Sequence, residues 1–181
     1  MTDRGSSVND FFEFTLQPRI MYKPGLVQEI GTELNTFGAE RAFIVADVGI
    51  VQAGLLGSIQ ENIAASIEIA GVFTDVPANS SVAAVEHGAA LAREAKADII
   101  IGIGGGSPID TAKAMRILLT EGGKLLDYQG YNLLTRPLVP MIAIPTTAGT
   151  GREVTSWAVI RAEEQGTKRA FVSHFLGQDL A

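Results

Sequence analysis

Residues 99–114 read IIIGIGGGSPIDTAKA, an apolar run that leads through glycines into a stretch with helical spacing. We expect residues 98–103 to form a buried strand, and Ser107 and Pro108 to open a helix as its N-cap and first residue. The glycines between them lack Cβ atoms, so their backbone N–H groups can face a ligand directly. A helix N-terminus adds unpaired N–H donors and partial positive charge, which makes this turn a candidate phosphate cradle.

The candidate cradle matches neither of the common phosphate-binding motifs. A dinucleotide fingerprint would have a third glycine where Ser107 stands, and no Gly-Lys-Ser/Thr follows at the spacing of a P-loop. A tight strand-to-helix turn without a ligand is the alternative interpretation.

Short apolar runs alternate with helix-spaced stretches along the rest of the chain. We expect strands at residues 42–46, 71–73, 98–103 and 140–144, and helices at residues 26–37, 51–70, 81–96 and 108–120. Continuous apolar strands separated by helices are typical of a parallel sheet with helices on both faces. The prediction is one α/β domain over residues 1–181 with a Rossmann-like parallel sheet, preceded by an extended or hairpin segment near residues 13–22.

Composition excludes several classes of function. The 181 residues carry 14 Lys+Arg against 20 Asp+Glu, a formal net charge of −6, and no cysteine. An acidic balance argues against nucleic-acid binding, and the absence of cysteine excludes disulfides, thiolate zinc sites and cysteine nucleophiles. The polar start and the short apolar runs suggest neither a signal peptide nor a membrane span, so we expect a cytoplasmic protein.

A second loop carries polar groups toward the same edge of the predicted sheet. Residues 145–155 read PTTAGTGREVT and follow the last strand expected in that sheet. The hydroxyls of Thr146, Thr147 and Thr150 suit an uncharged ligand rich in hydroxyl or amide groups. Loops of threonine and glycine are also common turns, but beside the glycine loop we expect this one to line a shared cleft.

Two carboxylates are candidates for the sugar or substrate side of that cleft. Asp47 follows a predicted strand and could accept hydrogen bonds from both ribose hydroxyls, or it could simply form a turn. Asp110 could face the substrate or sugar, or could complete a capping box with Ser107. Lys113 shares a helical face with Asp110 and could balance it, reach into the cleft or form a surface ion pair.

The two histidines, His87 and His174, stand apart in the sequence. With no cysteine they do not form a metal site by helical spacing, so no metal ligand is predicted in this chain.

With its two loops in this order, the chain resembles the nucleotide-binding domain of the iron-containing (group III) alcohol dehydrogenases. The resemblance rests on residues 104–114 and 145–155 and extends from about residue 14 to residue 181. Residues 76–79 (VPAN) also resemble a nucleotide-contacting turn of that family. Arg152 departs from the pattern, since many members have serine there. The first string is shared in looser form with glycerol dehydrogenases and dehydroquinate synthase.

The resemblance implies an NAD-binding site and assigns its residues position by position. Asp47 would hold the adenosine ribose and favour NAD over NADP, and Asp110 would lie near the nicotinamide and substrate as the one candidate catalytic residue. The residues implied to contact the cofactor are Asp47, Asn79, Gly104, Gly105, Gly106, Ser107, Asp110, Thr146, Thr147, Thr150 and Lys168.

The resemblance also implies a second, all-helical domain that this chain does not contain. In the family that domain binds Fe²⁺ or Zn²⁺, and the intact enzyme transfers hydride between a small alcohol or aldehyde and NAD(H). We therefore expect this chain to bind NAD without catalysing alone, and to form a homodimer by edge addition. Two alternatives stay open, a stand-alone nucleotide-binding module and a relative of glycerol dehydrogenase or dehydroquinate synthase.

Overall fold

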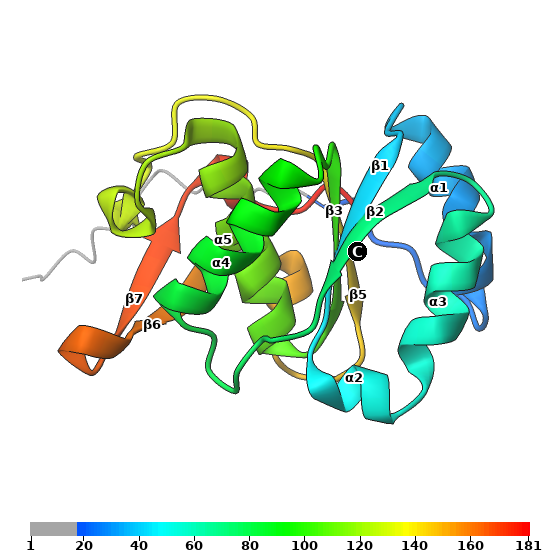
Figure 1. Cartoon of the computed structure of the whole chain (residues 1–181), viewed down its shortest axis with the longest axis horizontal. Helices are drawn as coiled ribbons and strands as arrows, with labels where there is room; N and C mark the ends of the chain where they lie inside the picture. Colours follow the sequence, from blue (N-terminus) through cyan, green and yellow to red (C-terminus); the bar gives the residue numbers. More distant parts are fainter. Residues whose placement is uncertain (1–17) are drawn as a thin grey trace, which may run out of the picture.

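The computed structural model describes residues 18–181 and arranges their strands in two sheets (Figure 1). The larger sheet is parallel and has the order β2-β1-β3-β5, built from Glu68–Phe73, Arg41–Val45, Ile99–Gly104 and Met141–Pro145. The smaller sheet has the order β4-β7-β6, built from Gly130–Tyr131, Thr167–Val172 and Trp157–Ala162. The predicted α/β class with a Rossmann-like parallel sheet is confirmed, whereas the small second sheet was not predicted.

Helices cover both faces of the parallel sheet, as Figure 1 shows. One face packs against α1 (Ile30–Thr36) and α3 (Leu55–Ala64), and the other against α4 (Val82–Glu94) and α5 (Gly106–Glu121). The remaining short helices are α2 (Val48–Gln52) and the 3₁₀ turns η1 (Leu26–Glu29), η2 (Leu125–Tyr128), η3 (Arg152–Val154), η4 (Glu163–Gln165) and η5 (His174–Leu176). Among the described residues, no helix combines the length and the apolar character needed to cross a bilayer.

Strand β3 is the centre of the hydrophobic core because all of its residues are buried. Ile99, Ile101 and Ile103 point into the core that contains α1 and α3, whereas Ile100 points into the core that contains α4 and α5. Helix α5 contacts β3 and also β6 of the second sheet, so it is buried along most of its length. This double contact places the start of α5 between the two sheets.

Some predicted boundaries were wrong for identifiable physical reasons. The single helix expected at residues 51–70 is two helices, α2 and α3, because Gly54 adopts a left-handed conformation with φ 71° between them. Strand β2 begins at Glu68 rather than residue 71, since it pairs with β1 from Arg41 onward. The helix expected at residues 26–37 begins as the 3₁₀ turn η1 and is α-helical only in α1.

The end of the chain extends the parallel sheet beyond β5. Leu180 forms parallel bridges with Ile142 of β5 on one side and with Arg19 on the other. The Met21 N–H donates to the Ala181 carbonyl at 2.8 Å. The predicted N-terminal extended segment is thus seen at residues 19–21, while residues 13–17 lie outside the described part of the chain.

Close packing of β3 on α5 predicts a strong cost for a side chain at Gly102. A Cβ there would lie 3.0 Å from Met141 Cε and 3.1 Å from Ala112 Cβ. We expect Gly102→Val to lower the free energy of unfolding in urea by about 2–3 kcal/mol, because overpacking displaces both neighbours. As the matched control, Gly57→Ala in α3 meets no atom within 4 Å and should raise stability by about 0.5–1 kcal/mol. A Gly102→Val protein as stable as the parent would contradict this packing.

Candidate functional site

The two glycine-containing loops lie side by side at the carboxyl edge of the parallel sheet. Gly104 at the end of β3 is in register with Pro145 at the end of β5, and the Thr146 N–H donates to the Gly104 carbonyl at 3.0 Å. A Cβ on Gly105 would lie 3.1 Å from Thr147 Oγ1, so glycine permits this close approach. The predicted convergence of the two loops is confirmed, at the edge where open α/β sheets bind ligands.

Helix α5 begins earlier than predicted. Its N-cap is Gly105, with φ −84° and ψ −155°, and its first helical residue is Gly106, so Ser107 is not the cap and Pro108 is not the first residue. No side chain caps this end, which leaves the first N–H groups of α5 without a side-chain acceptor. The Ser107 hydroxyl instead accepts a hydrogen bond from the Asn79 N–H at 3.1 Å.

A polar cleft of about 310 Å³ opens at this helix end. Asn79 adopts a positive φ of 58°, and its side-chain Oδ1 accepts a hydrogen bond from Lys168 Nζ at 2.8 Å. The cleft is lined by Asn79, Ser80, Gly106, Ser107, Asp110, Thr150, Arg152, Val159, Arg161 and Lys168. The structure therefore brings together six predicted cofactor residues that come from four separate parts of the chain.

Asp47 lies at the same sheet edge but outside that cleft. Its side chain caps α2, with Oδ1 accepting the Ile50 N–H at 3.1 Å. Within residues 18–181 its second oxygen, Oδ2, has no protein partner. The turn-forming role and the proposed ribose contact are therefore compatible, because they use different oxygens.

Asp110 is almost fully buried and connects α5 to the second sheet. Its Oδ2 accepts the Val159 N–H of β6 at 3.0 Å and lies 3.4 Å from Arg152 Nε, while Oδ1 is buried with no partner among the described residues. Burial raises the pKa of Asp110 to about 6, although the Val159 N–H and the charges of Arg152 and Lys113 oppose this shift. The capping-box alternative was wrong, since the carboxylate bonds to β6 and not to the start of its own helix.

Lys113 is fully buried and holds the second loop against α5. Its Nζ donates to the carbonyls of Arg152 at 2.6 Å, Thr155 at 2.5 Å and Trp157 at 3.2 Å. Burial lowers the pKa of Lys113 to about 7, and the Asp110 carboxylate opposes this shift. A surface ion pair was thus the wrong alternative for Lys113, which is a structural cation beneath the cleft.

Of the two cations that the second sheet contributes to the cleft, Lys168 was expected to contact the cofactor, whereas Arg161 was missed. Arg161 of β6 and Lys168 of β7 face each other in the antiparallel register, and the Arg161 N–H donates to the Ser80 carbonyl at 2.8 Å. The sequence signal was a pair of short apolar runs, residues 157–160 and 170–172, on either side of the turn at residues 163–166, which is typical of a hairpin.

The described residues do not provide a donor set for iron. Within residues 18–181, no three His, Cys, Asp or Glu side chains gather closely enough to hold a metal ion. His87 and His174 are exposed on separate elements, and the His87 ring packs edge-on against Phe73 at 5.6 Å. We therefore derive no step through a metal from these residues.

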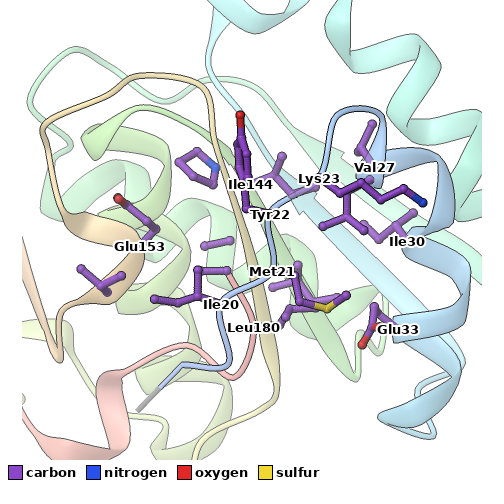
Figure 2. Close-up of a pocket in the computed structure, with 16 residues that line it drawn as sticks. Ile20, Met21, Tyr22, Lys23, Val27, Ile30, Glu33, Ile144, Glu153 and Leu180 are labelled. Carbon is purple, nitrogen blue, oxygen red and sulfur yellow. The ribbon is translucent and has the colours of Figure 1, made fainter. Parts of the chain in front are cut away.

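A second cavity of about 520 Å³ lies beside β5 and is mostly apolar (Figure 2). Its walls come from the N-terminal segment, from the end of β5 and from η3, and Leu180 and Ala181 also line it. The Tyr22 side chain at its rim is 93% exposed. This groove contains no polar cluster comparable to that of the cleft, and we assign it no part in nucleotide binding.

The sequence of this chain is similar to those of known proteins. Residues 17–181 match the family model described as iron-containing alcohol dehydrogenase, and the chain belongs to that family. The NAD-dependent methanol dehydrogenase of Bacillus methanolicus is 39% identical over 148 residues, which cover 81% of this chain and 39% of that protein.

Two solved structures superpose closely on this chain. A 1,3-propanediol oxidoreductase has a TM-score of 0.89 at 32% identity, over 94% of this chain and 44% of that one. A sulfoacetaldehyde reductase from Bifidobacterium kashiwanohense in complex with NAD⁺ has a TM-score of 0.83 at 28% identity, over 94% of this chain and 45% of that one. The chain spans about two fifths of the length of the curated relatives it matches.

The raised pKa of Asp110 predicts a specific pH dependence of stability. Between the usual carboxyl value of 3.8 and about 6, the native protein holds a proton that the unfolded chain releases. The protonated Asp110 side chain therefore contributes to the free energy of unfolding below about pH 4, and this contribution is lost as the pH rises through about 6. Relative to the parent, Asp110→Asn should therefore gain roughly 2 kcal/mol of unfolding free energy between these two pH values.

The measurement is urea denaturation of both proteins across this pH range. Glu61→Gln, an exposed change on α3, is the control and should run parallel to the parent. A constant difference between Asp110→Asn and the parent would show that Asp110 titrates normally and would contradict its burial.

Proposed function

We propose that this member of the iron-containing alcohol dehydrogenase family is the NAD-binding part of a metal-dependent alcohol dehydrogenase. The observation that carries the proposal is the uncapped start of α5, which opens into a cleft beside Ser107, Asn79 and Lys168. Unpaired backbone N–H groups, a helix N-terminus and a cation together suit a pyrophosphate. The NAD⁺ complex of the sulfoacetaldehyde reductase supports the choice of ligand.

Each part of the site has a role in holding the dinucleotide. Gly105, Gly106 and Ser107 bind the pyrophosphate through their backbone, and the free oxygen of Asp47 accepts hydrogen bonds from the adenosine ribose. The other residues expected to contact the cofactor are Asn79, Gly104, Asp110, Thr146, Thr147, Thr150 and Lys168. Asp47 repels a 2′-phosphate, which favours NAD over NADP.

Asp110 and Thr150 lie on the side of the cleft that we assign to the nicotinamide. Both line the cleft together with Val159, whose N–H fixes the Asp110 carboxyl at 3.0 Å. Bound NAD(H) would supply the hydride chemistry, and the residues of this chain would hold and orient it. The substrate class is a small alcohol or aldehyde, in line with the names of the methanol dehydrogenase, the propanediol oxidoreductase and the sulfoacetaldehyde reductase.

Metal binding and most of the substrate pocket belong, on this proposal, to the part of the family fold that this chain does not span. The described residues offer no set of ligands for Fe²⁺ or Zn²⁺, and the chain covers only 39% of the methanol dehydrogenase. The proposal therefore includes nucleotide binding without alcohol oxidation by this chain alone. A homodimer formed by edge addition remains a prediction.

The second candidate function is a nucleotide-binding module that acts without catalysis. It needs only the cleft that residues 79–168 line, and it requires no metal site. Both candidates predict NAD binding, and they differ only in whether a metal domain completes the enzyme. A lyase-type relative of dehydroquinate synthase is disfavoured by the threonine-rich loop at residues 145–155.

The proposal predicts saturable binding of NADH with discrimination against NADPH. In a fluorescence titration, NADH should bind the purified chain at least about tenfold more tightly than NADPH, a difference of about 1.4 kcal/mol. Asp47→Ser should close most of this gap, because serine can still cap α2 but carries no charge. Asp47→Gly should close it too, at some additional cost in stability.

A control variant and three contradicting results complete this binding experiment. Glu61→Gln removes a distant carboxylate and should preserve the preference for NADH. Absence of saturable binding at millimolar NADH would contradict the proposal, as would NADH production by this chain from an added alcohol. Equal affinity for NADH and NADPH in the parent would contradict the role of Asp47.

A further inference from the structure

The polar cleft contains more positive charge than the glycine cradle alone would give. Arg152, Arg161 and Lys168 line it, whereas Asp110 is the one carboxylate among its lining residues. Lys168 bonds to Asn79, and Arg161 Nη2 lies 3.4 Å from Glu163 Oε1 at the exposed rim. Arg152 is the less exposed of the two arginines, at 24% against 47% for Arg161.

The backbone of the loop fixes where the Arg152 side chain lies. Its carbonyl is bound by the buried Lys113 ammonium at 2.6 Å, and its guanidinium stands 5.7 Å from the centre of the Trp157 ring. Its Cγ is 3.4 Å from the position that a Cβ on Gly106 would occupy. The side chain, 24% exposed, therefore passes directly over the first residue of α5.

The contact between Arg152 and Asp110 leaves much of the bonding capacity of both groups unused. Arg152 Nε lies 3.4 Å from Asp110 Oδ2, longer than an ordinary hydrogen bond, and Asp110 Oδ1 stays buried without a partner in the described structure. Across residues 18–181, no protein acceptor bonds to either terminal nitrogen of Arg152. Arginine binds phosphate best through such a pair of parallel N–H groups.

We propose that Arg152 is a phosphate-binding residue, and that its terminal nitrogens donate to the pyrophosphate of a dinucleotide held at the start of α5. This inference rests on the proposed function, because it names a further ligand at the same site. The backbone cradle contributes only partial charges, whereas Arg152 supplies a full charge. Nucleotide affinity in this chain therefore depends on the Arg152 side chain as well as on the backbone of the glycine loop.

A full charge in the cleft makes binding sensitive to ionic strength, and this separates an electrostatic role from a structural one. The experiment titrates NADH into the parent, Arg152→Ser and Arg152→Lys at low and at high salt. We expect Arg152→Ser to weaken binding by about tenfold or more at low salt and by clearly less at high salt, because salt screens the lost attraction. Arg152→Lys should retain part of the affinity, since it keeps the charge but loses the paired geometry.

The matched control is Arg136→Ser, which removes an exposed arginine that is paired with Glu121 outside the cleft. It should change NADH affinity little at either salt concentration. Circular dichroism and thermal unfolding of each variant report whether the fold is intact, and Arg152→Lys provides the test if Arg152→Ser is unfolded.

Two results would overturn the inference. Unchanged affinity in Arg152→Ser, or an equal loss at low and high salt, would exclude a phosphate contact while leaving the proposed nucleotide site in place. Failure of the parent itself to bind NADH would overturn the inference together with the proposed function on which it rests.

Discussion

The pairing of β3 with β5 is the constraint on which the rest of the site depends. Gly104 and Pro145 end their strands in register, and the Thr146 N–H bond to the Gly104 carbonyl carries that alignment into the loops. Because parallel strands end at one edge, the glycine and threonine loops must meet. A one-residue shift of this register would offset the ends of the two strands, and it would also move the buried isoleucines of β3 to the opposite face.

A second set of interactions, between α5, the second loop and β6, gives the cleft its second wall. The buried ammonium of Lys113 binds three carbonyls from the loop and from β6, and Asp110 binds the Val159 N–H of β6. Removing these two ionisable groups from water costs free energy, and burial accordingly raises the pKa of Asp110 and lowers the pKa of Lys113. These contacts fix the second sheet against α5, and this sheet brings Arg161 and Lys168 to the cleft.

Sequence reasoning found the parts of the site that local chemistry determines. The continuous apolar run before the glycines predicted a buried strand that leads into a helix, and both are present, although the strand and the helix take up Gly104 and Gly106 and leave only Gly105 between them. The N-cap was misplaced at Ser107 because a glycine can itself take the cap conformation, and the helix then starts without a side-chain cap. Serine is the stronger capping residue in isolation, so local preference pointed to the wrong position.

The rest of the site depends on contacts between residues distant in the sequence. Nothing in the spacing of Asp110 and Lys113 indicates that both would be buried under β6, because Val159 of β6, which bonds to Asp110, lies 49 residues further along the chain. The two-residue strand β4 is likewise too short to leave a periodic signal. The sequence correctly predicted that Asp47 follows a strand, but it did not predict the short helix α2 whose start this side chain caps.

The most direct test of the central claim is nuclear magnetic resonance of the ¹⁵N-labelled chain during a titration with NAD⁺. The account predicts that the amide signals of Gly105, Gly106 and Ser107 shift together with those of Asn79 and Thr150, because all five line one nucleotide cleft or its cradle. Shifts confined to the apolar groove of Figure 2, around Tyr22 and Ile144, would contradict it and would place the ligand on a different surface of the protein.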